Sequence, residues 1–148
     1  MYSFLVHSHS YLRFLVLLLL FIVVGRSLAG WLGKRPFTGQ DNRFSLWLLI
    51  VTHVQLVLGL ILYFVSDQVK FGPDTMSHPT FRYWTVEHSS MMLIAVILIT
   101  VARITHKKMA SDSGKHLRLF VLNAIALLII IAAIVASGRG LFIPARLE

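Results

Sequence analysis

Residues 14–25 read FLVLLLLFIVVG, and this uninterrupted apolar run decides the class of fold. Mostly apolar residues continue on both sides of it, across about residues 11–32. A segment of roughly 20 such residues is long enough to cross a lipid bilayer as a helix. The segment lacks the basic leading region of a signal peptide, so we expect it to be a retained first span.

Three further apolar stretches follow, at residues 44–65, 84–102 and 117–136, and none has a charged residue near its centre. Short polar connections at 33–43, 66–83 and 103–116 separate them. Short connections between spans make neighbouring helices antiparallel. The sequence therefore predicts an all-α, up-down bundle of four transmembrane helices in a single domain, 1–148. The helices are expected at about 3–32, 42–65, 82–104 and 113–137.

The composition excludes several classes of protein. Of 148 residues, 57% are hydrophobic and only 14% are charged, whereas soluble proteins average roughly 45–50% and about 25%. A soluble domain of this size has too little interior to bury so much apolar surface. Because the chain has no cysteine, it has no disulfides, thiolate metal sites, iron–sulfur clusters or covalently attached c-type haem.

The net charge of +8 is explained first by the membrane. The connections at 33–43 and 103–116, with the helix ends beside them, carry nine basic residues, and the opposite side carries five. By the positive-inside rule these connections are cytoplasmic and both termini are outside. The basic loops are expected to contact anionic lipid, and they lack the interleaved aromatic residues that nucleic-acid binding would need. The five outer residues are Arg13, Lys70, Arg82, Arg139 and Arg146.

Seven histidines in so apolar a chain are the most informative feature. Ionisable side chains at membrane depth are costly and usually serve a function. Two of them, His78 and His106, fall in predicted loops and are expected to be ordinary solvated residues. For the others, the simplest alternative is that they are polar groups that hold the helices together.

One pair fits a b-type haem with two histidine ligands, which needs only two neutral imidazoles on opposite faces of an apolar slot. The ligands should come from diagonally opposite helices at similar depth. His9 lies about six residues into the first span and His88 about seven into the third, so their depths agree. Arg13 and Arg82 are on the same side of the membrane and could pair with haem propionates. Met92 is an alternative axial ligand on the face of His88.

The second and fourth spans offer another pair, His53 and His116. Their predicted depths differ by about 12 Å, so three interpretations stay open. The two could bind a second haem, with Gly59 leaving room for a flat ligand. His53 could instead hydrogen-bond Asn123, or it could hold a quinone headgroup together with Gln55.

Four segments carry a resemblance that covers nearly the whole chain: HSHSYLR at 7–13, THVQ at 52–55, YWTVEH at 83–88 and KHLRLF at 115–120. They resemble a family of small bacterial four-helix membrane proteins labelled cytochrome b or cytochrome-b-like. The resemblance implies a multi-pass protein of the bacterial inner (cytoplasmic) membrane. A weaker resemblance links LRLFVLN at 117–123 to the fourth helix of HemJ-type oxygen-independent protoporphyrinogen oxidases. That family's Trp-x-x-x-Lys pattern is missing, since the residue four positions after Trp84 is His88 and not a lysine. The bundle also resembles SirB-type proteins.

These observations predict a haem b cytochrome that carries electrons between quinol and a protein partner, or serves as a subunit of a respiratory complex. Its expected partners are lipid, a quinone, other membrane redox subunits or a second copy of the chain. The alternatives are a haem-dependent porphyrinogen oxidase and an accessory subunit without a cofactor. We find no GxSxG, HExxH or P-loop pattern in the sequence that would indicate other catalytic chemistry.

Overall fold

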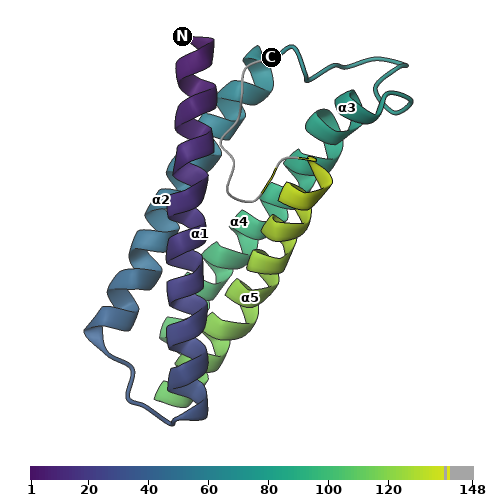
Figure 1. Ribbon diagram of the computed structural model, residues 1–148. Helices are drawn as coiled ribbons and strands as arrows, with labels where there is room; N and C mark the ends of the chain where they lie inside the picture. Colours follow the sequence, from purple (N-terminus) through teal and green to yellow (C-terminus); the bar gives the residue numbers. More distant parts are fainter. Residues whose placement is uncertain (139, 141–148) are drawn as a thin grey trace.

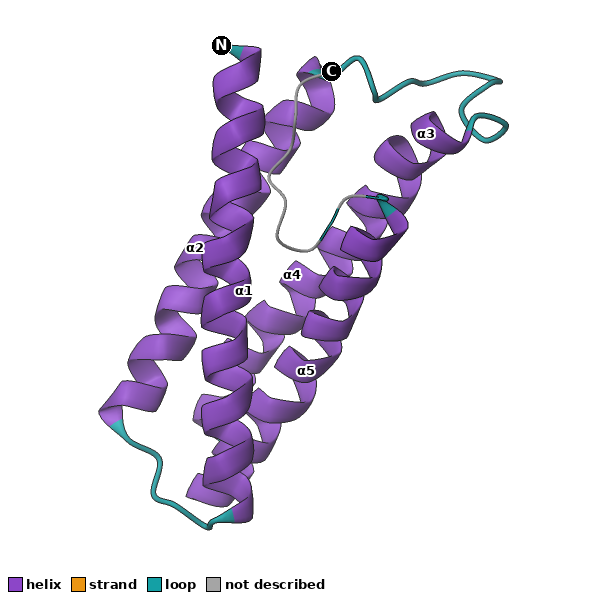
Figure 2. Cartoon of the chain, in the orientation of Figure 1, coloured by secondary structure: helices purple, strands orange, loops and turns teal. Residues whose placement is uncertain are grey.

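The computed structural model describes residues 1–138 and 140, and within them the only regular elements are helices (Figure 2). In chain order these are α1 (Tyr2–Leu32), α2 (Gly39–Val65), α3 (Pro79–Arg82), α4 (His88–Thr105) and α5 (Asp112–Ala136). A π-helical turn at Tyr83–Glu87 joins α3 to α4, and a 3-10 turn at His106–Lys108 follows α4. The result is four spans, with Pro79–Lys108 as the third.

The four spans confirm the predicted all-α membrane fold, and local chemistry sets their ends. The second span begins at Gly39 because Thr38 caps it: the Thr38 hydroxyl accepts from the Asp41 amide, and Asp41 in turn accepts from the Thr38 amide. The third begins at Pro79, a residue suited to the first turn of a helix. The fourth is capped by the Ser111 hydroxyl.

The helices form an up-down bundle in which α1 packs against α2 and α5, while α4 packs against α5 (Figure 1). Contacts between α2 and α4 are sparse. Consequently α1 lies diagonally opposite α4, and α2 opposite α5, as the antiparallel connections predicted. The α1–α2 pair and the α4–α5 pair separate toward the end that carries the N-terminus (Figure 1).

The interior and the exterior of the bundle are both apolar. Leu20, Leu48, Ile99 and Leu119 are fully buried in the core. The two helices α4 and α5, which pack against each other, carry several buried alanines. Such small residues let helix backbones approach closely. They are Ala95, Ala102, Ala126 and Ala133. Large apolar side chains such as Leu18, Val57, Ile97 and Leu128 point outward, as expected for a multi-pass protein whose surroundings are lipid.

A buried carboxylate fixes the connection between α1 and α2. One oxygen of Asp41 accepts from Arg26 Nε at 2.9 Å and from Arg35 Nη2 at 3.0 Å. The other oxygen accepts from Thr38. Asp41 is 5% exposed, so these bonds replace the water that a buried charge would otherwise lose.

The same end of the bundle buries two histidines. His116 is fully buried, and its ring lies directly on the α-carbon of Gly30. The ring of Phe37 packs between His116 and His106, with centroid separations of 5.2 and 5.3 Å. The prediction that His106 is solvated is wrong: the 3-10 turn continues α4 and turns His106 inward, where it is 2% exposed. His78 is exposed, as predicted.

Which end faces the cytoplasm stays a prediction from the positive charges. Two of the outer basic residues used for it, Arg139 and Arg146, lie outside the described residues.

The Gly30–His116 contact predicts an asymmetric response to alanine. A Cβ at Gly30 would collide with three ring atoms of His116, whereas one at Gly25 of the same helix meets nothing within 4 Å. Gly30→Ala should lower the free energy of unfolding by about 1–3 kcal/mol, and Gly25→Ala should raise it by up to about 1 kcal/mol. Denaturant unfolding in detergent micelles measures both. Adding His116→Ala should relieve the cost of Gly30→Ala. If Gly30→Ala and Gly25→Ala changed the free energy of unfolding equally, the contact between Gly30 and His116 would be contradicted.

Candidate functional site

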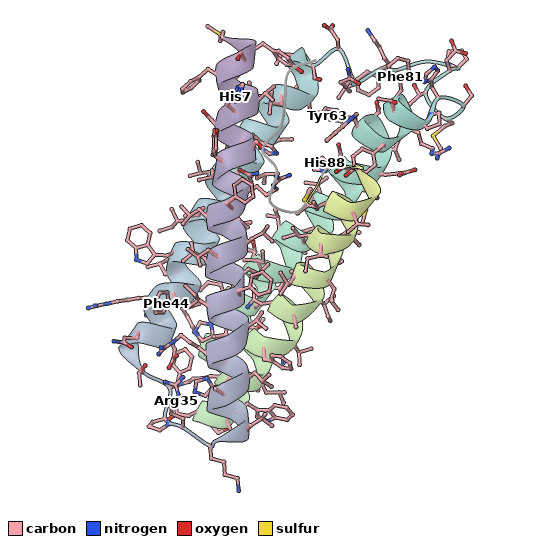
Figure 3. The ribbon with its side chains drawn as sticks, in the orientation of Figure 1. His7, Arg35, Phe44, Tyr63, Phe81 and His88 are labelled. Carbon is pink, nitrogen blue, oxygen red and sulfur yellow. The ribbon has the colours of Figure 1, made fainter. Side chains whose placement is uncertain are left out.

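A cavity of about 540 Å³ occupies the space where the two helix pairs separate. Side chains from α1, α2, α4, α5 and the π-helical turn line it. Its volume lies within the roughly 300–1,000 Å³ of typical ligand pockets. Of the described residues that line it, two are histidines, His9 of α1 and His88 of α4. Both members of the pair that the sequence predicted therefore line the same cavity, and Figure 3 labels His88 at the start of α4.

A side chain from α2, Gln55, contacts His9 of α1. The Gln55 side-chain nitrogen donates to the His9 backbone carbonyl at 3.0 Å and lies 3.4 Å from His9 Nε2. The ring itself lies close to Gly59, where an added Cβ would be 3.1 Å from His9 Cε1. Gly59 therefore makes room for a histidine ring, where the sequence predicted room for a ligand beside His53.

Three buried polar atoms of this cavity have no hydrogen-bond partner among the described residues: His9 Nδ1, Gln55 Oε1 and Thr52 Oγ1. Nearly all buried polar groups in native proteins are satisfied, and each exception calls for an explanation such as a ligand or an ordered water. Their clustering in one cavity, next to a histidine, indicates a place built to receive a polar or metal-bearing group.

The π-helical turn precedes His88 directly and is anchored on three sides. The Tyr83 hydroxyl donates to the Ala133 carbonyl of α5, and the Tyr63 hydroxyl of α2 donates to the Thr85 carbonyl. Thr85 Oγ1 also accepts from the Lys70 amide. The His88 ring packs near Tyr83 and Trp84, at 5.9 and 5.2 Å between centroids. Single π turns of this kind occur often at functional sites, and here the turn sets the direction of His88.

The two arginines predicted near haem propionates take different positions. Arg13 lines the cavity. Arg82 forms an ion pair with Glu87, at 2.8 Å, and does not belong to the described lining. Of the two arginines, Arg13 is thus the one that lines the cavity. Met92 also lines the cavity.

The structure does not bring the other predicted pair together. His53 is exposed on the outside of α2 and its Nδ1 bonds the Leu49 carbonyl of the same helix. His116 lies buried at the opposite end of the bundle from the cavity. Asn123 is buried and donates to the Leu119 carbonyl rather than to His53. Gln55 faces His9, so it does not share a site with His53.

Two features of the site were missed in the sequence. The π turn has no clear sequence signal. Thr52, by contrast, had one: it lies three residues before Gln55 and seven before Gly59, so helical spacing places all three on one face of α2. Once Gln55 was a candidate, Thr52 could have been included.

Comparisons with protein-family models, curated proteins and solved structures find no match to this chain. Within residues 1–138 and 140, no group of three or more metal-ligating side chains is placed to hold an ion. A haem iron with two axial histidines needs only two ligands from the protein, and two histidines, His9 and His88, line the described cavity.

The unpartnered hydroxyl gives a prediction for the ligand-free protein. Thr52→Val should change the free energy of unfolding by less than about 0.5 kcal/mol, because no protein hydrogen bond is lost. Thr85→Val, equally buried, removes the bonds to Lys70 and should cost about 1–2 kcal/mol. Denaturant unfolding of both variants measures the difference. A cost at Thr52 as large as at Thr85 would show that its hydroxyl has a protein partner.

Proposed function

We propose that this protein is a membrane cytochrome that binds one b-type haem in the cavity, with His9 and His88 as the axial ligands. The observation that carries the proposal is the meeting of these two side chains, from diagonally opposite helices, at a single cavity. His9 Nδ1 adds support, because it is buried and has no described partner. A histidine ligates iron through whichever ring nitrogen carries no proton, and the partner of the other nitrogen sets which one that is.

The remaining lining fits a haem in its chemistry. Most of the wall is apolar, with Val16, Leu56 and Ile130 among its residues, which suits the face of a macrocycle. Ser89 and Ser90 are small and leave space beside His88. Arg13 supplies a positive charge for a propionate. When bound, a haem supplies one-electron transfer.

The chain's own contribution is to hold and orient this group. Gln55 fixes α1 against α2 at the level of His9, and the anchored π turn fixes His88. Outer-shell partners of this kind set the orientation of metal-ligating histidines. Most of the wall around these residues is apolar, and the hydrophobic shell around a metal site tunes its redox potential.

The position of the cavity supports a lipid-soluble electron partner. Leu60 of α2 and Leu93 of α4 line the cavity, and both are more than one third exposed. The cavity thus lies next to the sparse α2–α4 contact and the lipid beyond it. A quinol in the bilayer could therefore approach the site without passing through water, and a protein partner would complete the transfer.

A quinone-type ligand in the same cavity is the second candidate. Gln55 Oε1 and Thr52 Oγ1 are the observation that favours it, since both lack a described partner and the Thr52 hydroxyl could donate to a quinone oxygen. Under this alternative the purified protein would carry an extractable quinone and no haem.

Reduced-minus-oxidised absorption spectra of the purified protein and its variants test the haem proposal. The wild type should show b-type bands, and His9→Ala and His88→Ala should each lose at least about 90% of them, because each removes an iron ligand. His7→Ala on α1 and His53→Ala on α2 are matched controls. They should keep the bands, because the side chain of each histidine bonds a backbone carbonyl of its own helix. Unchanged spectra in both ligand variants would refute the assignment.

The remaining alternatives give other outcomes in companion experiments. Complementation of a strain that lacks protoporphyrinogen oxidase would indicate the enzyme. Stable association with larger membrane subunits, without bound haem or quinone, would indicate an accessory subunit.

A further inference from the structure

Arg103 is a buried cation at the end of the bundle opposite the haem cavity. It is 6% exposed, and its Nη1 donates to the Ser45 hydroxyl at 2.8 Å and to Asn42. Its described hydrogen-bond partners are all neutral. Burying a charge without a counter-ion is expensive, so buried charges in proteins are normally paired.

The described carboxylates do not supply that counter-ion. Asp41 is engaged by Arg26 and Arg35. Asp112, the other described acidic residue at this end, lies 3.6 Å from Lys115. Within the described part of the chain, no carboxylate forms an ion pair with Arg103. A bound anion at this end of the bundle would supply the missing counter-charge.

A second cavity, of about 280 Å³, is connected to Arg103 through Asn42 and has a basic lining. Phe37, Asn42, His106, Lys107 and Lys115 line it. Asn42 is the direct link, because the same residue accepts from Arg103. His106 is 2% exposed and belongs to this wall. Two lysines, a buried histidine and an amide thus line one pocket, and the amide residue, Asn42, joins it to Arg103.

We propose that this cavity binds the phosphate of an anionic phospholipid headgroup. A lipid fits better than a soluble anion because the pocket lies where the third span ends and the fourth begins, at the end of a bundle of membrane-spanning helices. Exposed apolar side chains of these two spans, such as Ile104 and Leu117, suit acyl chains around the bundle, while the lysines suit the phosphate. Basic pockets between transmembrane helices are known to take headgroups in this way. The site is independent of the haem proposal.

The test measures lipid selectivity in nanodiscs that contain phosphatidylcholine with 10% spin-labelled phosphatidylglycerol. The motionally restricted fraction of the label reports lipid held by the protein. Lys107→Gln/Lys115→Gln removes two charges from the wall and should weaken phosphatidylglycerol binding about 30-fold, from roughly a fivefold change per lysine. Lys34→Gln/Lys108→Gln removes two exposed charges at the same end that do not line the pocket.

The outcomes separate the interpretations. Loss in the first pair together with near wild-type binding in the second supports a built headgroup site. Equal loss in both pairs would show only general attraction to a basic surface and would overturn the proposal, as would no loss in either. Inorganic phosphate is the probe for a soluble anion: displacement of the labelled lipid by phosphate at about 1 mM would overturn the lipid assignment in favour of a phosphate site. Circular dichroism of both variants confirms that the helices remain folded.

Discussion

The contact between the His116 ring and the bare α-carbon of Gly30 closes one end of the bundle. It lets α5 approach α1 where any larger residue at position 30 would keep them apart. Small side chains on α4 and α5 extend this close packing along the bundle. Nearly straight helices that touch at one end and cross at an angle must diverge at the other, and the α1–α2 and α4–α5 pairs do so (Figure 1). The large cavity is a consequence of that divergence.

The two ends of the bundle differ in chemistry as well as in packing. At the closed end a buried aspartate, buried histidines and several cations form a polar cap around Phe37, with one small basic pocket. At the open end the polar atoms that lack partners are ring, amide and hydroxyl groups around an apolar space. The first set favours an anion at the membrane surface, and the second favours a neutral or metal-bearing group within the membrane.

The sequence was a good guide wherever a residue's role depends on helical periodicity and depth. The spans, their antiparallel order and the placement of His9 and His88 at one depth of the bundle all follow from length, spacing and short connections. Features that depend on the rotation of a helix about its axis were beyond it. The outward orientation of His53 could not be predicted, because no sequence signal distinguishes a lipid-facing from a core-facing histidine in an apolar helix. The π turn before His88 and the inward turn of His106 are likewise set by tertiary packing against Tyr83 and Phe37.

The proposal that His9 and His88 hold one haem is best tested by the stoichiometry of haem in the purified protein. A pyridine haemochrome assay, combined with quantitative amino-acid analysis, gives haem b per chain. We expect about one haem per chain, because the described structure brings one pair of histidines to a cavity and leaves His53 apart from His116. No haem in protein purified from haem-replete cells would contradict the account, and so would two haems per chain.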